Sequence, residues 1–427
     1  MTVIRAFRGV RYDPARVELA KVIVPPYDVI SAEGREQLYE RDPHNAVRFE
    51  LTREVQDEAA TDYSEVWETL ASWLDSGVLK QDEVPALYAL RQRFTAPDGG
   101  LFTREGFYAE LGLASYDERV VLPHERTLAG PKADRLKLLR ATRANLSSVF
   151  VLYEDREEVI AEAISSAFES ADTLTALDDA GTEQSLARIT DPDAVRTICD
   201  FLAERPVVMA DGHHRYETAL TYRDEQRQAG ASEAADAPHA STLAYFSNAF
   251  APGSLLLPIH RVVRREVLGD DDGWRERLAG WESKRVAVSD PAAIPGLLEE
   301  HLAPFESTPA FALDDGSGNL EVYWRAADDE GDLMVSILER EILGKAFGLD
   351  IQAIRHGAVL FKHDAVEAAR EVRTGEGAVA LYLNGLTPDD VFRVTRAGGL
   401  MPQKSTFFYP KIPTGMVFRL HAEPQPR

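Results

Sequence analysis

A short apolar strand that runs directly into a polar helix start is the feature that most restricts the fold of this chain. Residues 206–210 read PVVMA, residues 211–215 read DGHHR, and a helical pattern follows. Glycine at position 212 allows a sharp turn and the close approach of a ligand. The free N–H groups and the positive dipole end of a helix that starts here suit a phosphate. The segment therefore predicts a phosphate-binding strand–turn–helix unit.

The polar side chains of this segment fit phosphoryl chemistry. Arg215 can hold two phosphate oxygens at once, and His213 and His214 add donors. Asp211, at the strand end, is placed to bind a Mg²⁺ ion or to accept a proton. The alternative is an N-capping aspartate followed by surface histidines, although five adjacent polar or glycine residues exceed what a cap needs. A transition-metal site is a weaker alternative, since adjacent histidines seldom bind one metal.

The charge of the whole chain excludes one class of partner. It has 47 basic and 71 acidic side chains in 427 residues, which gives a formal net charge of −24. The negative electrostatic field of such a chain repels a nucleic-acid backbone, so no nucleic-acid partner is expected. A small phosphorylated ligand needs only a local positive pocket and is compatible with the charge. The N-terminal residues lack the apolar core of a signal peptide, and no apolar run approaches the roughly 20 residues of a membrane span. We expect a cytoplasmic protein without a membrane partner, and its oligomeric state stays open.

Hairpin signals and helix–strand alternation occur in the same chain. Residues 87–94 and 102–113 flank a Pro-Asp-Gly-Gly turn and predict a β-hairpin. Together with the helix–strand alternation after them, they favour an α+β fold with a mixed-sheet core. We expect a main α+β part over residues 1–264, a smaller α/β insertion or second domain over 265–375, and a C-terminal segment, 376–427, that returns to the site.

Cations gather at three further places in this acidic chain. Residues 124–137 contain His124 and Glu125 and then a helix start rich in Lys and Arg, where positive charge opposes the helix dipole. Cations at a helix start, where the dipole disfavours them, favour an anionic ligand. The alternative is ion pairs to Glu125 or Asp134. Residues 260–261 are a cationic pair or a simple strand end, and residues 404–411 are a phosphate-binding loop or an ordinary solvated loop. The phosphate-binding candidates in these segments are Lys132, Arg135, His260, Arg261, Lys404, Ser405, Thr406 and Lys411.

Two resemblances follow from these motifs. Residues 211–215 with the helix after them resemble the phosphate-binding turn of the ParB/sulfiredoxin-like superfamily, which includes ParB domains, sulfiredoxins and free serine kinases. Almost the whole chain resembles the family called domain of unknown function 1015. The segments that carry this second resemblance are VPPYDVI at 24–30, PHERT at 123–127, PKADR at 131–135, LPIHR at 257–261, and MPQKST with YPK within 401–411.

The superfamily resemblance implies a kinase that acts on a small hydroxylated amino acid. Free L-serine would become O-phosphoserine, with ATP, ADP or pyrophosphate as the phosphoryl donor and Mg²⁺ as the metal. Gly212, His213 and Arg215 would then hold phosphate. Two alternatives stay open: a non-catalytic nucleotide-binding regulator of the ParB type, and a phosphatase of a phosphorylated metabolite. The sequence lacks the P-loop and protein-kinase motifs. The catalytic candidates are Asp211, Glu125, His124 and His214.

Overall fold

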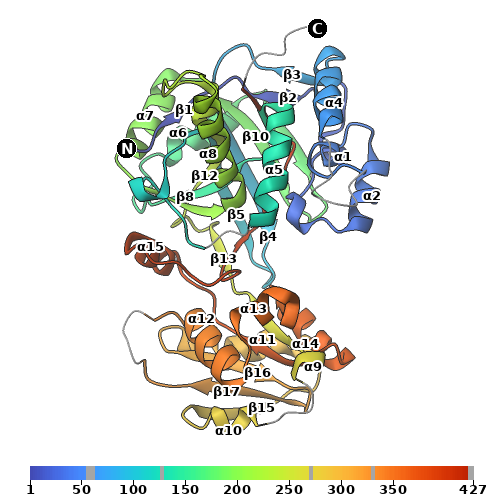
Figure 1. The fold of residues 1–427 in the computed structure, drawn as a ribbon, viewed down its shortest axis with the longest axis vertical. Coiled ribbons are helices and arrows are strands. Elements are labelled where there is room, and N and C mark those ends of the chain that lie inside the picture. The colour runs from blue at the N-terminus through green and yellow to red at the C-terminus, as the bar shows by residue number, and fades with distance from the viewer. Residues whose placement is uncertain (54–62, 126–128, 269–272, 328–331, 422–427) are drawn as a thin grey trace. The chain divides into compact units, whose positions relative to one another are not determined.

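The computed structural model divides the chain into two compact units (Figure 1). The first unit consists of Met1–Leu255 and Pro410–Arg427, and the second of Leu256–Tyr409. The chain therefore leaves the first unit once and returns to it near its C-terminus. The described residues are 1–53, 63–125, 129–268, 273–327 and 332–421.

A large mixed sheet forms the centre of the first unit. Within the described residues its strands run in the order β6-β11-β8-β12-β5-β4-β10-β9, with β1 paired to β5. Strand β11 is parallel to β6, and β12 is parallel to β8, while the other pairs are antiparallel. The predicted α+β class and the predicted hairpin, which is β4–β5, are confirmed. The strands are β1 (Ile4–Arg5), β4 (Leu87–Thr95), β5 (Leu101–Gly112), β6 (Val121–Leu122), β8 (Val149–Tyr153), β9 (Leu174–Leu177), β10 (Glu183–Ile189), β11 (Val207–Asp211) and β12 (Ser241–Asn248).

One core lies between this sheet and the helices α6 (Ala161–Ser165), α7 (Pro192–Ala203) and α8 (His213–Gln228). Alternate strand residues such as Phe107 and Phe246 point into it, where they meet Ile198 of α7 and Tyr216 of α8. Helix α7 begins after Asp191, whose side chain accepts hydrogen bonds from the first turn. This packing fixes the start of α8 at the end of β11.

A second core joins short helices to the C-terminal end of the chain. Val47, Phe49 and Trp73 pack there against Phe418, whose neighbours form strand β21 (Arg419–Leu420). Strand β21 pairs with β7 (Ala144–Asn145), directly after α5 (Ala129–Thr142). Smaller elements of this region are α1 (Leu19–Val22), α2 (Ala32–Arg41), α3 (Val47–Glu50), α4 (Ser64–Asp75), β2 (Val10–Tyr12) and β3 (Leu79–Gln81).

The second unit has its own sheet, with the order β15-β17-β16-β19-β14-β18. Buried residues of α11 (Ile294–His301) and α14 (Ala365–Thr374) pack in one core with those of the sheet. The domain limits expected after residues 264 and 375 do not coincide with the limits of this unit, because β14 and β19 pair within one sheet. The strands are β14 (His260–Arg264), β15 (Glu282–Ala287), β16 (Ala310–Asp314), β17 (Asn319–Trp324), β18 (Val359–Lys362) and β19 (Gly377–Tyr382).

The chain passes from the first unit to the second at β13 (Leu255–Leu257) and returns after β20 (Phe407–Tyr409). These two strands pair with each other. Among the residues that the structure describes, no helix is both long and apolar enough to cross a lipid bilayer.

Candidate active site

The predicted strand–turn–helix unit is present at the junction of β11 and α8. Gly212 has a φ of 85°, in the left-handed region that L side chains rarely adopt. A Cβ at this position would lie 3.1 Å from Nε of Arg215 and 3.1 Å from Cα of Val149. The Tyr216 N–H donates to the Gly212 carbonyl, and no side chain in the described part of the chain caps the helix. The N-terminus of α8, with its positive dipole end, therefore lies at this turn.

Asp211 is held by two cations. Nζ of Lys411 lies 2.6 Å from Oδ2, Nη2 of Arg215 lies 3.8 Å from Oδ1, and the Gly212 N–H donates to Oδ1 at 2.6 Å. Burial alone would raise the pKa of Asp211, but the charges of Lys411 and Arg215 outweigh this and lower it. Asp211 is thus ionised and pairs with both cations, and its lowered pKa makes it a poor proton acceptor.

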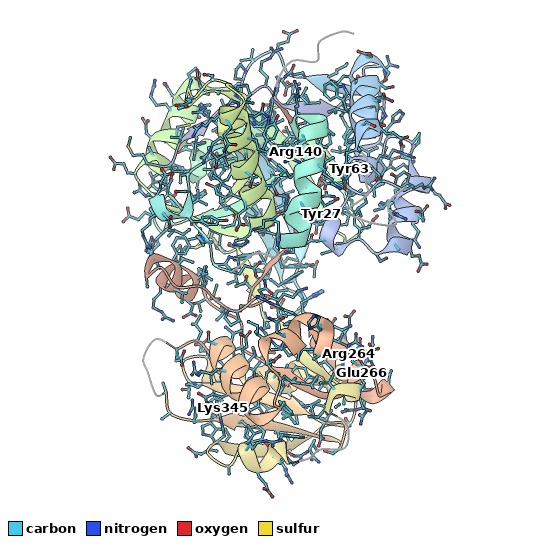
Figure 2. All side chains as sticks on the ribbon, viewed as in Figure 1. Tyr27, Tyr63, Arg140, Arg264, Glu266 and Lys345 are labelled. Carbon is cyan, nitrogen blue, oxygen red and sulfur yellow. The ribbon has the colours of Figure 1, made fainter. Side chains whose placement is uncertain are left out.

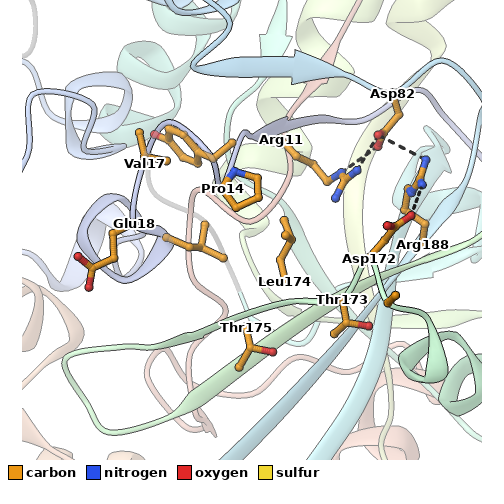
Figure 3. Close-up of a pocket in the computed structure, with 13 residues that line it drawn as sticks. Arg11, Pro14, Val17, Glu18, Asp82, Asp172, Thr173, Leu174, Thr175 and Arg188 are labelled. Carbon is orange, nitrogen blue, oxygen red and sulfur yellow. Dashed lines mark hydrogen bonds and ion pairs between the residues drawn. The ribbon is translucent and has the colours of Figure 1, made fainter.

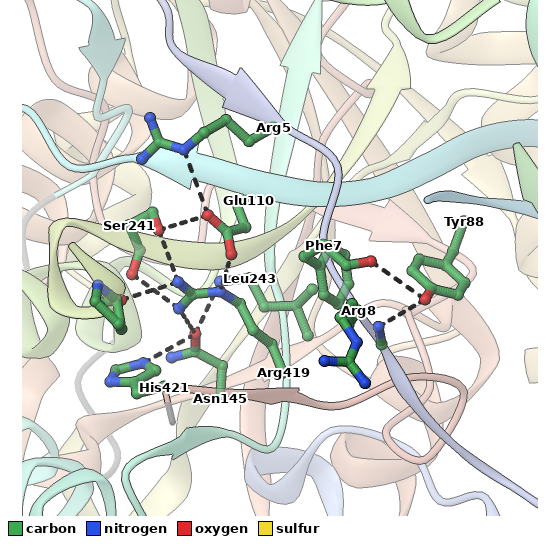
Figure 4. A network of polar contacts seen from close by, with 12 residues as sticks. Arg5, Phe7, Arg8, Tyr88, Glu110, Asn145, Ser241, Leu243, Arg419 and His421 are labelled. Atoms are coloured by element: carbon green, nitrogen blue, oxygen red, sulfur yellow. Dashed lines mark hydrogen bonds and ion pairs between the residues drawn. The ribbon is translucent and has the colours of Figure 1, made fainter. Parts of the chain in front are cut away.

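Lys411 reaches Asp211 because the C-terminal segment crosses the first unit. The Pro410 carbonyl accepts a hydrogen bond from the buried Arg104 at 2.5 Å, and the Lys411 carbonyl accepts one from Gln92 at 3.2 Å. Arg419 fixes the other end of the segment in a network of polar contacts (Figure 4). Lys411 lies in the predicted C-terminal segment, and neither Arg104 nor Gln92 has a sequence signal that points to its role in holding that segment.

Two buried histidines lie beside the turn. His124 follows β6, next to β11, and its ring meets that of His213 edge to face at 4.7 Å. The His124 N–H donates to Nε2 of His213 at 3.4 Å, which leaves the ring proton of His213 on Nδ1. This Nδ1 lies 3.7 Å from Oε1 of Glu125. Burial and the nearby His124 lower the pKa of His213 well below its ordinary value, so its imidazole is neutral at pH 7. The predicted residues His124, Glu125 and His213 therefore come together.

Helices α5 and α8 lie side by side and bring Lys132 to the same region (Figure 1). Its Nζ is 2.8 Å from Oε2 of Glu217, so the ion-pair alternative holds for Lys132, with a partner other than Glu125 or Asp134. Burial lowers the pKa of the half-buried His214, against the opposing charges of Glu125 and Glu217. Arg126 and Thr127, in the motif between His124 and α5, lie outside the described residues.

Arg135 does not fit the predicted phosphate-binding role. Its side chain is 6% exposed and pairs with Glu50 at 3.0 Å and with Asp134 at 2.6 Å. It also donates to the Tyr63 hydroxyl and lies over the Tyr27 ring, two aromatic residues that Figure 2 labels. The ion-pair alternative is correct here, because these groups surround the guanidinium. A local charge pattern cannot reveal Glu50, which is 85 residues away.

The other predicted phosphate-binding residues belong to the second unit. Nη2 of Arg261 donates to the Lys404 carbonyl at 3.2 Å, so these two residues meet. The Ser405 hydroxyl is turned inward and donates to the Pro402 carbonyl at 2.5 Å. His260 is buried, and burial together with the Arg261 charge lowers its pKa to about 3. Thr406 is half-buried in the same loop.

The side chains that the structure describes do not by themselves form a magnesium site. Among the described residues, no group of three or more His, Cys, Asp or Glu side chains could hold a metal ion. At Asp211 the predicted position of Mg²⁺ is taken by the ammonium group of Lys411. Mg²⁺ remains a prediction for a complex in which phosphates bring most of the oxygen ligands.

A cavity of about 710 Å³ lies elsewhere in the first unit (Figure 3). Arg11 and Arg188 line it, and both interact with Asp82, while Arg188 also pairs with Asp172. The predicted site residues are not among the residues that line it. It is therefore not the site described above.

Comparison with known proteins places the chain in a family. The family model described as a protein of unknown function, DUF1015, matches residues 4–317, and the chain belongs to this family. A search of curated proteins found no match.

Solved structures with a similar arrangement have low identity and low TM-scores. A free serine kinase in complex with AMP is 13% identical, over 71% of this chain and 86% of that chain, with a TM-score of 0.35. A conserved hypothetical protein from Pyrococcus furiosus is 13% identical over 72% and 93%, with a TM-score of 0.34. C-terminally truncated SbnI from Staphylococcus aureus is 10% identical over 71% and 84%, with a TM-score of 0.32.

Proposed function

We propose that this chain is a small-molecule phosphotransferase that phosphorylates the hydroxyl group of a free amino acid. L-Serine is the first acceptor to test, with ATP, ADP or pyrophosphate as the donor. The observation that carries the proposal is the Lys411–Asp211 ion pair at the start of α8, beside Gly212 and Arg215. A lysine, an arginine and a helix N-terminus at one turn are suited to a phosphoryl group, whose charge they neutralise.

The positive groups at the turn would hold the phosphoryl donor. Arg215 offers a planar fork, and Lys411 a compact charge, to phosphate oxygens. Both cations are already positioned by the Asp211 carboxylate, so little reorganisation is needed when the donor binds. Lys132 is 35% exposed in its pair with Glu217 and could exchange that partner for a phosphate oxygen.

The acceptor would be activated by Glu125. In the proposed step, the hydroxyl oxygen of the acceptor forms a bond to phosphorus while the bond from phosphorus to the leaving group breaks. The hydroxyl proton passes to the Glu125 carboxylate, whose Oε1 lies 3.7 Å from Nδ1 of His213. Asp211 does not take this proton, because Lys411 and Arg215 hold its pKa below the ordinary value. The neutral His214 is the second candidate for the base.

A donor-by-acceptor screen tests this proposal. The full chain is incubated with ATP, ADP or pyrophosphate and with serine or other hydroxylated amino acids, and phosphorylated product is measured by mass spectrometry. We expect phosphoserine from at least one pair, and a rate lower by roughly 100-fold or more in Arg215→Ala and Lys411→Gln. Lys80→Gln is the matched control, since Lys80 is 65% exposed and pairs with Asp13 in the same unit. Wild-type rates in Arg215→Ala or Lys411→Gln would contradict the assignment of the site.

The screen also separates the alternatives. A donor that binds without any product would favour the non-catalytic nucleotide-binding regulator. Release of phosphate from phosphoserine in the absence of another acceptor would favour the phosphatase.

A further inference from the structure

A buried guanidinium held only by carbonyl groups lies in the described part of the second unit. Arg261, on β14, is 3% exposed, and its hydrogen bonds go to the carbonyl groups of Ile259 and Lys404. Within the described residues, no carboxylate forms an ion pair with it. Arg135 and Arg419, which are equally buried, each have a glutamate partner. Burying a charge without a counter-charge is costly, and here burial lowers the pKa of Arg261 to about 10.

Lys404 shares an aromatic neighbour, Phe361, with this guanidinium. Its Nζ lies 5.6 Å from the centroid of the Phe361 ring, and Cζ of Arg261 lies 5.5 Å from the same centroid. Lys404 is exposed and has a φ of 55°, a strained backbone for a residue other than glycine. Buried Met401 and Ser405 fix the loop on both sides, and Arg261 holds the Lys404 carbonyl. These contacts hold the loop in a conformation in which the Lys404 side chain is exposed.

The other charges around Arg261 do not neutralise it. The charge of Glu339 raises the pKa of Arg261, and the charge of Asp364 raises that of His260, but both effects are smaller than that of burial. Within the described residues, neither carboxylate forms an ion pair with these groups. His260 stays neutral because it is buried. Lys362, next to Phe361, is paired with Glu371. A positive centre thus remains at Arg261 in the second unit.

We propose that Lys404 binds an oxyanion of the phosphate class on the second unit, with Arg261 as the residue that positions the lysine and adds positive charge beneath it. A compact ammonium group is suited to a phosphate oxygen, and the buried guanidinium strengthens the field because little water screens it. This site is additional to the turn at Gly212, and it does not depend on the proposed function.

Pyrophosphate binding to the full chain, measured by isothermal titration calorimetry, tests the site. The Arg215→Ala variant serves as the background, because it weakens the turn in the first unit. We expect this variant still to bind pyrophosphate, and the additional Lys404→Gln change to weaken the remaining affinity about tenfold or more. Lys345→Gln is the matched control, since Lys345 is exposed, lies in the same unit and is labelled in Figure 2. It should leave the affinity unchanged.

Three outcomes would overturn the proposal: unchanged affinity in the Lys404→Gln double variant, complete loss of binding in Arg215→Ala alone, or an equal loss in the Lys345→Gln control. A titration with L-serine distinguishes the class of anion. If Lys404→Gln weakens serine binding and not pyrophosphate binding, the ligand is a carboxylate and the phosphate assignment is wrong. Because binding is measured without turnover, a chain that binds pyrophosphate but makes no phosphoserine refutes only the proposed kinase activity.

Discussion

Gly212 shows how a single residue can be required for two separate reasons. Its φ of 85° disfavours any L side chain, and the space that a Cβ would need is occupied by the Arg215 guanidinium and by Val149. Gly230, just beyond the other end of α8, has the same φ of 85°, but a Cβ there would meet nothing within 4 Å. Substitutions at both glycines strain the backbone, but only a substitution at Gly212 also brings a steric conflict at the site. Comparing the two therefore separates these effects.

We expect Gly212→Ala and Gly230→Ala each to lower the free energy of unfolding by about 1–2 kcal/mol, because both place alanine in the left-handed region. Only Gly212→Ala should also weaken the binding of the phosphoryl donor, by about tenfold, since it displaces Arg215. Urea unfolding and calorimetric titration measure the two effects. Equal donor affinity in the two variants would contradict the expectation that Gly212→Ala displaces a donor-binding Arg215.

At the scale of the element, strand β21 is held in place by the side chain of Arg419. Arg419 is 3% exposed and donates to Glu110 at 2.7 Å, Asn145 at 3.0 Å and the Ser241 hydroxyl at 2.8 Å (Figure 4). Arg5 interacts with the same Glu110, but at 3.5 Å and with 27% of its side chain exposed. These contacts hold β21 against the first unit, and β21 ends the segment that carries Lys411.

Arg419→Met should therefore lower the free energy of unfolding by about 3–5 kcal/mol, the cost of breaking a buried charge pair. The matched change Arg5→Met removes a more exposed partner of Glu110 and should cost less than about 1 kcal/mol. Guanidinium unfolding curves of the two variants compare these costs. If the two variants lose the same free energy of unfolding, the burial of Arg419 does not explain how much its contacts stabilise the first unit.

At the scale of the whole molecule, the first unit is built from two separate stretches of chain. The bridges Val10–Phe418 and Val24–Thr414 and the Lys411–Asp211 pair all join its C-terminal stretch to earlier residues. The second unit leaves and rejoins it through the paired strands β13 and β20. The second unit is thus inserted into the first at one place.

We expect residues 1–255 joined to 410–427 by a short flexible linker to fold, because β13 and β20 bring the two crossings of the chain side by side. Residues 1–255 alone should not reach the same structure, since they lack Phe418 of the second core and Arg419. Amide hydrogen exchange and circular dichroism compare the two proteins. Equal protection in both would mean that the C-terminal stretch contributes little to the first unit.

Much of the site could be predicted because its chemistry lies within short segments. The DGHHR segment contains the turn glycine, a carboxylate and an arginine, and local pattern alone predicts a strand before it and a helix after it. The hairpin β4–β5 was equally predictable, since its turn residues lie next to alternating strands. The place of Arg135 was not predictable, because its partners Glu50 and Tyr63 are far away in sequence.

The sequence by itself determined the α+β class, the family and the strand–turn–helix unit, because local periodicity, turn chemistry and contiguous motifs establish these. Only the tertiary structure decided that Lys411 is the cation at Asp211, that Arg135 is enclosed by the protein, and that Arg261 meets Lys404. Those contacts join residues separated by 85 to 200 positions. They depend on how whole elements pack, and no local pattern encodes which distant side chain will meet a given charge.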